Sequence, residues 1–172
     1  MEVFWMRNEL QKARRMESGC DMESIRSGLL LDDYGVVIHY TDDYDCIISK
    51  LERSGCPYDL SQNGYCRVHS KCISCGITFW IAFQFCGRRL IKISLLPVSI
   101  QNDQKSYAKL QAVLKKQLGR VSIFQYLHNF ANPAKLFKWS IPYVTIMHTL
   151  YDGFGYEDVI SIRIDDDGVC SV

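Results

Sequence analysis

The sequence predicts an α+β fold, an antiparallel sheet of about six strands with two helices on one face. Two segments carry apolar residues at helical spacing, and several others alternate apolar and polar residues, as strands do. Each helix has one apolar stripe and each hairpin has one strongly apolar face, so the helices and the sheet must cover each other. The same order, a helix and then three strand-like runs, occurs in residues 41–96 and 106–164, which predicts a tandem repeat.

The first forty residues carry weaker signals. A helical stripe in residues 1–27 predicts a short helix, and apolar runs on either side of a turn at Asp32–Gly35 predict a hairpin. The expected organisation is an N-terminal helix and opening hairpin over residues 1–40, an α+β domain over 41–164 and a polar tail over 165–172.

The two helices are predicted from their ends as well as from their periodicity. Thr41 suits the N-cap of the first helix, and Gly55 suits its C-terminal end. The second helix is expected over Lys105–Leu118, before Gly119. The stripes that would face the sheet are Tyr44, Ile47, Ile48 and Leu51 in the first helix and Tyr107, Leu110, Leu114 and Leu118 in the second.

Alternation identifies the strands. Phe79, Ile81 and Phe83 alternate with polar or small residues, and a similar pattern follows the next turn, which predicts a hairpin over Ile77–Leu96. The other predicted strands are Tyr65–Val68, Leu136–Trp139, Tyr143–Leu150 and Glu157–Ile164.

Composition narrows the class of protein. The chain has 172 residues, 48% of them hydrophobic, and can bury its own core. Its formal net charge of +1 gives no general attraction to nucleic acid or anionic membranes. Ile77–Phe85, the longest apolar stretch, is too short to cross a bilayer, and the N-terminus has no signal-peptide pattern, so a cytoplasmic location is expected. The eight cysteines are then expected to be reduced.

One local pattern suits a metal ion. Cys66, His69, Cys72 and Cys75 offer four ligands of the kind that zinc prefers. Strand alternation puts Cys66 and His69 on opposite faces of the sheet, however, and zinc sites normally draw their ligand pairs from separate segments. A turn between strands is the favoured interpretation. Zinc binding, or a thiol-redox role for these residues, is the alternative function.

The histidines show no catalytic pattern. His39, His69, His128 and His148 have no partner at a catalytic spacing, and His148 alternates with apolar residues, which favours a buried histidine in a strand. No phosphate-binding glycine motif occurs, and scattered Ser, His and Asp residues do not define a hydrolytic triad. The sequence therefore predicts neither enzymatic activity nor a cofactor.

The remaining candidate is a surface. The mixed face of the sheet would carry Trp80, Gln84 and Lys92, and aromatic residues among isolated polar groups are typical of a protein-binding site. The second half of the chain would add Trp139, Tyr143, Thr145 and Met147. In the alternative, residues 1–40 fold back over this face and Trp80 belongs to the core.

The helix ending at Leu118–Gly119, the hairpin Phe85–Ile93 and Trp139 before the closing hairpin resemble a known scaffold. It is shared by β-lactamase inhibitory protein and the small lipoproteins of outer-membrane assembly, and the resemblance, one of architecture, covers residues 41–164. It implies that helices cover one side of the sheet and that the other side binds a protein. Since the chain shows no export signal or lipidation cysteine, the resemblance implies an inhibitor or a bacterial toxin-immunity protein rather than a membrane-assembly factor. The overall expectation is a non-enzymatic, cytoplasmic protein-binding module.

Overall fold

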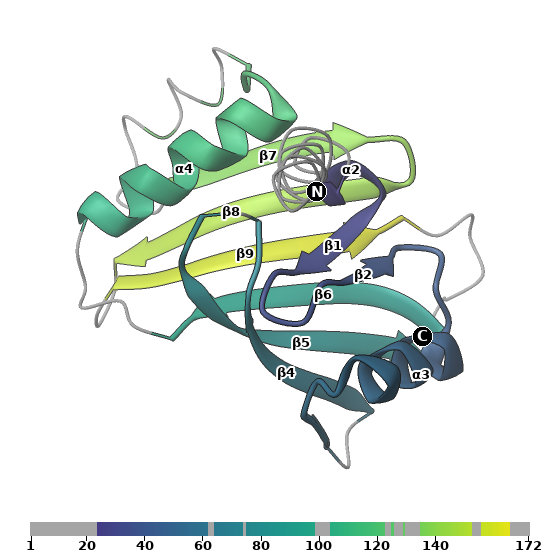
Figure 1. Ribbon diagram of the computed structural model, residues 1–172. Coiled ribbons are helices and arrows are strands. Elements are labelled where there is room, and N and C mark those ends of the chain that lie inside the picture. The colour runs from purple at the N-terminus through teal and green to yellow at the C-terminus, as the bar shows by residue number, and fades with distance from the viewer. Residues whose placement is uncertain are drawn as a thin grey trace, which may run out of the picture.

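The computed structural model describes residues 24–61, 64–73, 75–98, 104–122, 125, 129, 135–152 and 156–165. Most of the predicted N-terminal helix and the polar tail after Asp165 lie outside these residues. The elements, labelled in Figure 1, are α2 (Ser24–Ser27), β1 (Gly28–Leu31), β2 (Val36–His39), α3 (Tyr44–Ser54), β3 (Tyr58–Leu60), β4 (Tyr65–Lys71), β5 (Thr78–Cys86), β6 (Arg89–Pro97), α4 (Gln104–Leu118), β7 (Lys135–Ile141), β8 (Val144–Asp152) and β9 (Tyr156–Ile164).

The α+β prediction is confirmed. Strands β3 to β9 form one antiparallel sheet in the order β3-β4-β5-β6-β9-β8-β7, and β1 and β2 form a separate hairpin. Helix α3 is followed by the short β3 and then by β4, β5 and β6, while α4 is followed by β7, β8 and β9. The last strands of the two sets, β6 and β9, pair at the centre of the sheet. The two helix-and-strand units therefore join side by side.

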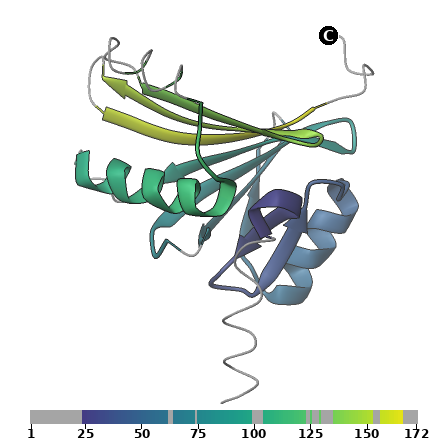
Figure 2. The ribbon, with the colours of Figure 1, turned by 90° about the horizontal axis from the view of Figure 1, so that it is seen from above.

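The covering elements all lie on one side of the sheet. Figure 2 shows α4 and the unit of α2, β1, β2 and α3 on the same side of the seven strands. The β5 side chains Phe79, Ile81 and Phe83 are fully buried, and one hydrophobic cluster extends from Ile25 in α2 to Ile162 in β9. The described part of the N-terminal segment therefore packs on the apolar face of the sheet and not on the mixed face.

The β1-β2 hairpin is fixed to the end of β4. Leu31 forms an isolated antiparallel bridge with Cys72, and the backbone N–H of Asp32 donates to the carbonyl of Lys71 at 2.8 Å. The carboxylate of Asp33 accepts the backbone N–H of Lys71, also at 2.8 Å. This hydrogen bond, supported by the charge of Lys71, lowers the pKa of Asp33.

The start of α3 differs from the prediction. Its N-cap is Asp43, not Thr41, and the Asp43 carboxylate accepts the backbone N–H of Cys46 at 2.8 Å. A strand-like bridge to Arg89 accompanies an extended conformation at Asp43, with φ −84° and ψ 175°, which delays the helix. The predicted end is confirmed, since Gly55 has the left-handed conformation with φ +68° that glycine tolerates.

Sequence reasoning missed strand β3. In this strand Tyr58 pairs with Val68 and Leu60 with Cys66. Three residues are too few for an alternating pattern to be read from the sequence.

No helix within the described ranges is long and apolar enough to span a membrane.

Candidate functional site

We define the open face as the side of the seven-stranded sheet opposite α3 and α4. Strand pairing places on it the odd-numbered residues of β4, β8 and β9 and the even-numbered residues of β5, β7 and, from Lys92 onward, β6. Exposure follows this alternation in β4, where Cys66 and Val68 are buried while Arg67 and His69 are exposed. No helix in the described part of the chain covers the open face.

An apolar row crosses the open face from strand to strand. With Leu96 and Val159 one position beyond the pair Leu95–Ile160, the row reads His69, Trp80, Leu96, Val159, Thr149 and Leu136, and four of these residues, Trp80, Leu96, Val159 and Leu136, are apolar. Trp80 is 53% exposed, Leu96 44% and Leu136 42%. Because neighbouring strands lie about 4.8 Å apart, a row over six strands is about 24 Å long. Exposed apolar residues aligned in this way are typical of an interaction surface.

Trp80 is the member of this row whose side chain is held by contacts with its neighbours. Its indole packs against the imidazole of His69, with ring centroids 4.8 Å apart and the planes tilted by 51°. Leu96 lies directly opposite Trp80 on the neighbouring strand. These contacts on two sides hold the indole in place while half of it is exposed, so it loses little conformational freedom when a partner covers it.

Positive charge lies beside the apolar row. The cationic side chains of the open face are Arg67, Lys71, Lys92, Lys138 and Arg163. Among residues whose side chains the structure describes, the carboxylates beside these cations are Asp33, which pairs with Lys71 at 3.5 Å, Asp59, opposite Arg67 at the β3 edge, and Asp165, which accepts the Thr145 hydroxyl at 3.2 Å. Five cations against three carboxylates leave the described face with an excess of positive charge, although the whole chain is nearly neutral.

The structure places five of the predicted partner-binding residues on the open face: Trp80, Gln84, Lys92, Thr145 and Met147. Trp139 is a correction. It lies opposite Ile146 on the covered face, is only 5% exposed, and its Nε1–H donates to the carbonyl of Gly119 at 3.0 Å. The odd-numbered residues of β7 face the core. The weak alternation in this strand did not show which of its residues would do so.

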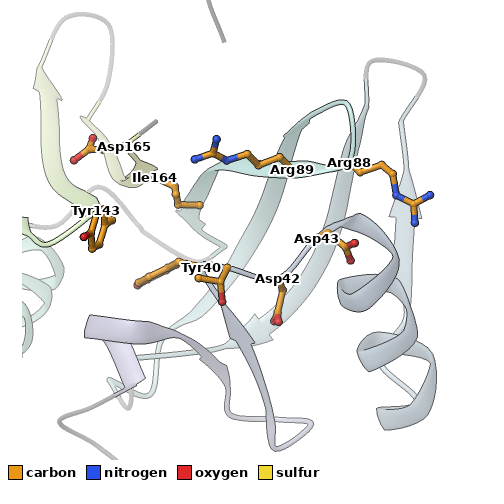
Figure 3. A pocket seen from close by; sticks show the side chains of 9 residues that line it. Tyr40, Asp42, Asp43, Arg88, Arg89, Tyr143, Ile164 and Asp165 are labelled. Carbon is orange, nitrogen blue, oxygen red and sulfur yellow. The ribbon is translucent and has the colours of Figure 1, made fainter. Parts of the chain in front are cut away.

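Tyr143 lies apart from the strands of the open face. It sits in the turn between β7 and β8, has a positive φ of 64° and is 71% exposed. There it lines a pocket of about 470 Å³ at the end of the sheet, shown in Figure 3. The other lining residues are Tyr40, Thr41, Asp42, Asp43, Arg88, Arg89, Ile164 and Asp165.

The carboxylates of this pocket already serve the fold. Asp42 forms an ion pair with Lys50 at 2.6 Å, Asp43 caps α3, and Asp165 accepts the hydroxyl of Thr145. Figure 3 shows Arg89 pointing toward Ile164 and Asp165, whereas Arg88 points away from them and pairs with Asp45. A pocket whose acidic groups are engaged in this way does not define a ligand, and we assign none.

The four candidate metal ligands are not brought together. Cys66 is buried on the covered side of β4, and His69 is exposed on the open face, as strand alternation predicts. Cys72 and Cys75 follow β4, and the Cys75 thiol lies 3.4 Å from the carbonyl oxygen of Cys72. Within the described ranges, no group of three or more His, Cys, Asp or Glu side chains is placed to hold a metal ion.

The buried thiols are poorly suited to redox chemistry. Burial raises the pKa of Cys66 to about 12 and raises the pKa of Cys72 well above its usual value. Burial also raises the pKa of Cys75, against the opposing effect of backbone hydrogen bonds. Redox-active cysteines depend on a lowered pKa and a solvent-accessible thiolate, so this environment gives no support to the thiol-redox alternative.

Sequence analysis missed a polar cluster beneath α4. Nε2 of His148 lies 2.6 Å from Oδ1 of Asp158, and Nδ1 lies 2.5 Å from Oε1 of Gln111. The ring of Tyr107 stacks on the imidazole, with centroids 4.4 Å apart. In the β8-β9 register, His148 is opposite Ile160, so Asp158 is its diagonal neighbour on the same face. The hairpin register was the signal that could have revealed this pair.

A histidine oriented by a carboxylate is common in acid–base catalysis, but access decides whether it can act. His148 is 0% exposed, and both of its ring nitrogens contact groups within the protein. Burial, and then the charge of Asp158, raises the pKa of the stacked Tyr107. Since no substrate atom can reach the imidazole in this arrangement, we interpret the cluster as a structural link between α4 and the β8-β9 hairpin.

Comparisons of this chain with protein-family models, with curated proteins and with solved structures found no match.

Proposed function

We propose that this chain is a non-enzymatic protein-binding module whose open face recognises an acidic surface of a partner protein. The observation that carries the proposal is Trp80, a half-exposed indole held between His69 and Leu96 within an apolar row. Tryptophan and arginine are the residues most often responsible for binding energy in protein interfaces. The flanking cations then favour a partner with carboxylates around an apolar centre.

A nucleic acid fits the same face less well. Single strands are held by several aromatic rings on which successive bases stack. Beyond Trp80, the apolar row continues with the aliphatic side chains of Leu96, Val159 and Leu136, which offer no stacking surface. An aliphatic row with one aromatic anchor is better matched to protein side chains.

The proposal is tested by affinity capture with the full-length chain and matched variants. The baits are wild type, Trp80→Ala, the double reversal Lys92→Glu/Arg163→Glu, and a control reversal Lys109→Glu/Lys116→Glu at exposed positions of α4. Proteins that depend on the open face are retained by wild type and by the control and are lost from both face variants. Both reversals change the net charge by the same amount. The control therefore shows whether a loss of binding depends on the open face or only on the net charge.

For a retained partner, truncating an anchor such as Trp80 is expected to weaken binding by about thirtyfold or more. The partner should be acidic, and nuclease treatment should not release it. Equal retention by all four baits, or release by nuclease, contradicts the proposal. An inhibitor or immunity protein would also abolish the activity or toxicity of its partner, and Trp80→Ala would restore it.

A further inference from the structure

Strand β7 forms one edge of the sheet, and side-chain amides occupy its outward backbone groups. Oδ1 of Asn129 accepts the N–H of Leu136 at 2.9 Å, and its Nδ2 donates to the Leu136 carbonyl at 2.6 Å. Oε1 of Gln125 accepts the N–H of Lys138 at 2.8 Å, and its Nε2 donates to the Lys138 carbonyl at 3.2 Å. Each amide supplies one donor and one acceptor to one strand residue, as a neighbouring strand would.

The spacing of the two amides matches the strand. Gln125 and Asn129 both have helical backbone conformation, and each amide is bonded to one of two alternate strand residues. Leu136 and Lys138 are alternate strand residues, which corresponds to about 6.8 Å. In an antiparallel edge strand only alternate residues direct both backbone groups outward. On β7 these are Leu136, Lys138 and Ser140, and the first two are capped.

The opposite edge of the sheet is closed by different means. Strand β3 has three residues and follows Pro57, which has no N–H to offer a neighbour. Strand β7 has seven residues and is the long edge of the sheet. An uncovered edge of that length is a template for pairing with another chain.

We propose that Gln125 and Asn129 form an amide cap over a latent strand-pairing site on β7, and that its occupant, once the cap is removed, is β7 of a second copy of this chain. Antiparallel pairing about a twofold axis through Phe137 brings Leu136 of one copy opposite Lys138 of the other, and the reverse. This register uses the two residues that the cap covers. It also avoids placing two Lys138 side chains opposite each other, which would repel.

The test compares the self-association of full-length wild type and Gln125→Ala/Asn129→Ala by sedimentation velocity over a range of concentrations. Wild type should be monomeric, and the double variant should dimerise with a dissociation constant lowered by at least about tenfold, the effect of roughly one net hydrogen bond. Adding Lys138→Pro should restore the monomer, because proline removes an outward N–H without disturbing the β8 ladder. Gln84→Ala, which removes an amide from the open face, should sediment as wild type.

Hydrogen exchange locates the effect on the strand. In wild type the amide hydrogens of Leu136 and Lys138 are protected, in the dilute double variant they exchange faster, and at high concentration they are protected again. If Gln125→Ala/Asn129→Ala fails to fold, Gln125→Met/Asn129→Leu keeps a similar side-chain size and removes both the donors and the acceptors, with the same expectation. A monomer at every concentration in the folded capless variant overturns the proposal. A wild-type dimer that Lys138→Pro dissociates also overturns the proposal. The same holds for a dimer of the capless variant that persists after Lys138→Pro is added.

Discussion

Replacing Asp158 by leucine removes the carboxylate that lies 2.6 Å from the buried His148 imidazole. The two side chains are 2% and 0% exposed, so water cannot take the place of the missing partner. Breaking a buried pair on one side costs about 3–5 kcal/mol, because the remaining polar group stays buried without its partner. We expect Asp158→Leu and His148→Leu each to lower the free energy of unfolding by that amount.

The double variant His148→Leu/Asp158→Leu should be more stable than either single variant. It replaces the pair by apolar side chains, a change that is often neutral in buried sites. What remains is the amide of Gln111, which loses the imidazole 2.5 Å away and costs about 1–3 kcal/mol as an unpaired buried group. Urea denaturation followed by far-ultraviolet circular dichroism measures all three variants, with His39→Leu as an exposed control expected within about 0.5 kcal/mol of wild type.

The non-additivity of the two single effects on the free energy of unfolding shows whether His148 and Asp158 interact. If the two single effects add within about 0.5 kcal/mol, the two residues do not form an energetic pair and the reasoning fails. A loss below about 3 kcal/mol in either single variant would refute the assigned burial cost. Should the single variants unfold altogether, a folded double variant still demonstrates the coupling. The double variant should also bind the proposed partner as wild type does, because the cluster lies on the covered face.

Three further predictions concern other regions. Burial raises the pKa of the Cys66 thiol to about 12 in the folded state. The stability that the protonated thiol contributes is therefore fully present below the ordinary thiol pKa. Above that pKa the free energy of unfolding falls by about 1.4 kcal/mol per pH unit, until the pH reaches the folded-state pKa. Denaturation between neutral and alkaline pH should show a shallower decline in Cys66→Ala than in wild type, and equal slopes would contradict this. Trp139→Phe should lower stability by about 0.5–1.5 kcal/mol through loss of its hydrogen bond to Gly119, measured by urea denaturation; no change would contradict the assigned bond. Partner binding should weaken as salt rises from about 0.05 M to about 0.5 M, with a smaller dependence in Lys92→Glu; an unchanged salt dependence would argue against charge recognition.

Local patterns predicted the parts of this fold that local forces determine. Phe79, Ile81 and Phe83 alternate with small or polar residues, and only one burial pattern satisfies that alternation. The end of α3 followed from Gly55, because its left-handed conformation is a local requirement. The start of α3 did not, because the bridge between Asp43 and Arg89 is a tertiary contact that outweighs the capping preference of Thr41.

The features that sequence reasoning missed depend on register and on contacts between distant segments. His148 and Asp158 meet because of how β8 pairs with β9, and a shift of one residue would place them on opposite faces. The amides of Gln125 and Asn129 reach β7 through a packing arrangement that no periodicity encodes. The candidate site was found in part, since alternation placed Trp80 and Lys92 on one face, but not the apolar row, which requires the order of all six strands.

The capped edge on β7 and the open face are two surfaces through which this sheet could contact another protein. A sheet can recognise another protein through backbone groups at an edge or through side chains on a face, and pairing at an edge draws its affinity from main-chain hydrogen bonds. Here one edge is three residues long after Pro57, and the other carries the amides of Gln125 and Asn129. Because β3 is short and two residues of β7 are capped, the recognition that we propose falls to the open face around Trp80. It follows that the capless variant, studied at concentrations where it is monomeric, should bind the partner with unchanged affinity, whereas a loss of affinity would mean that the partner uses the β7 edge.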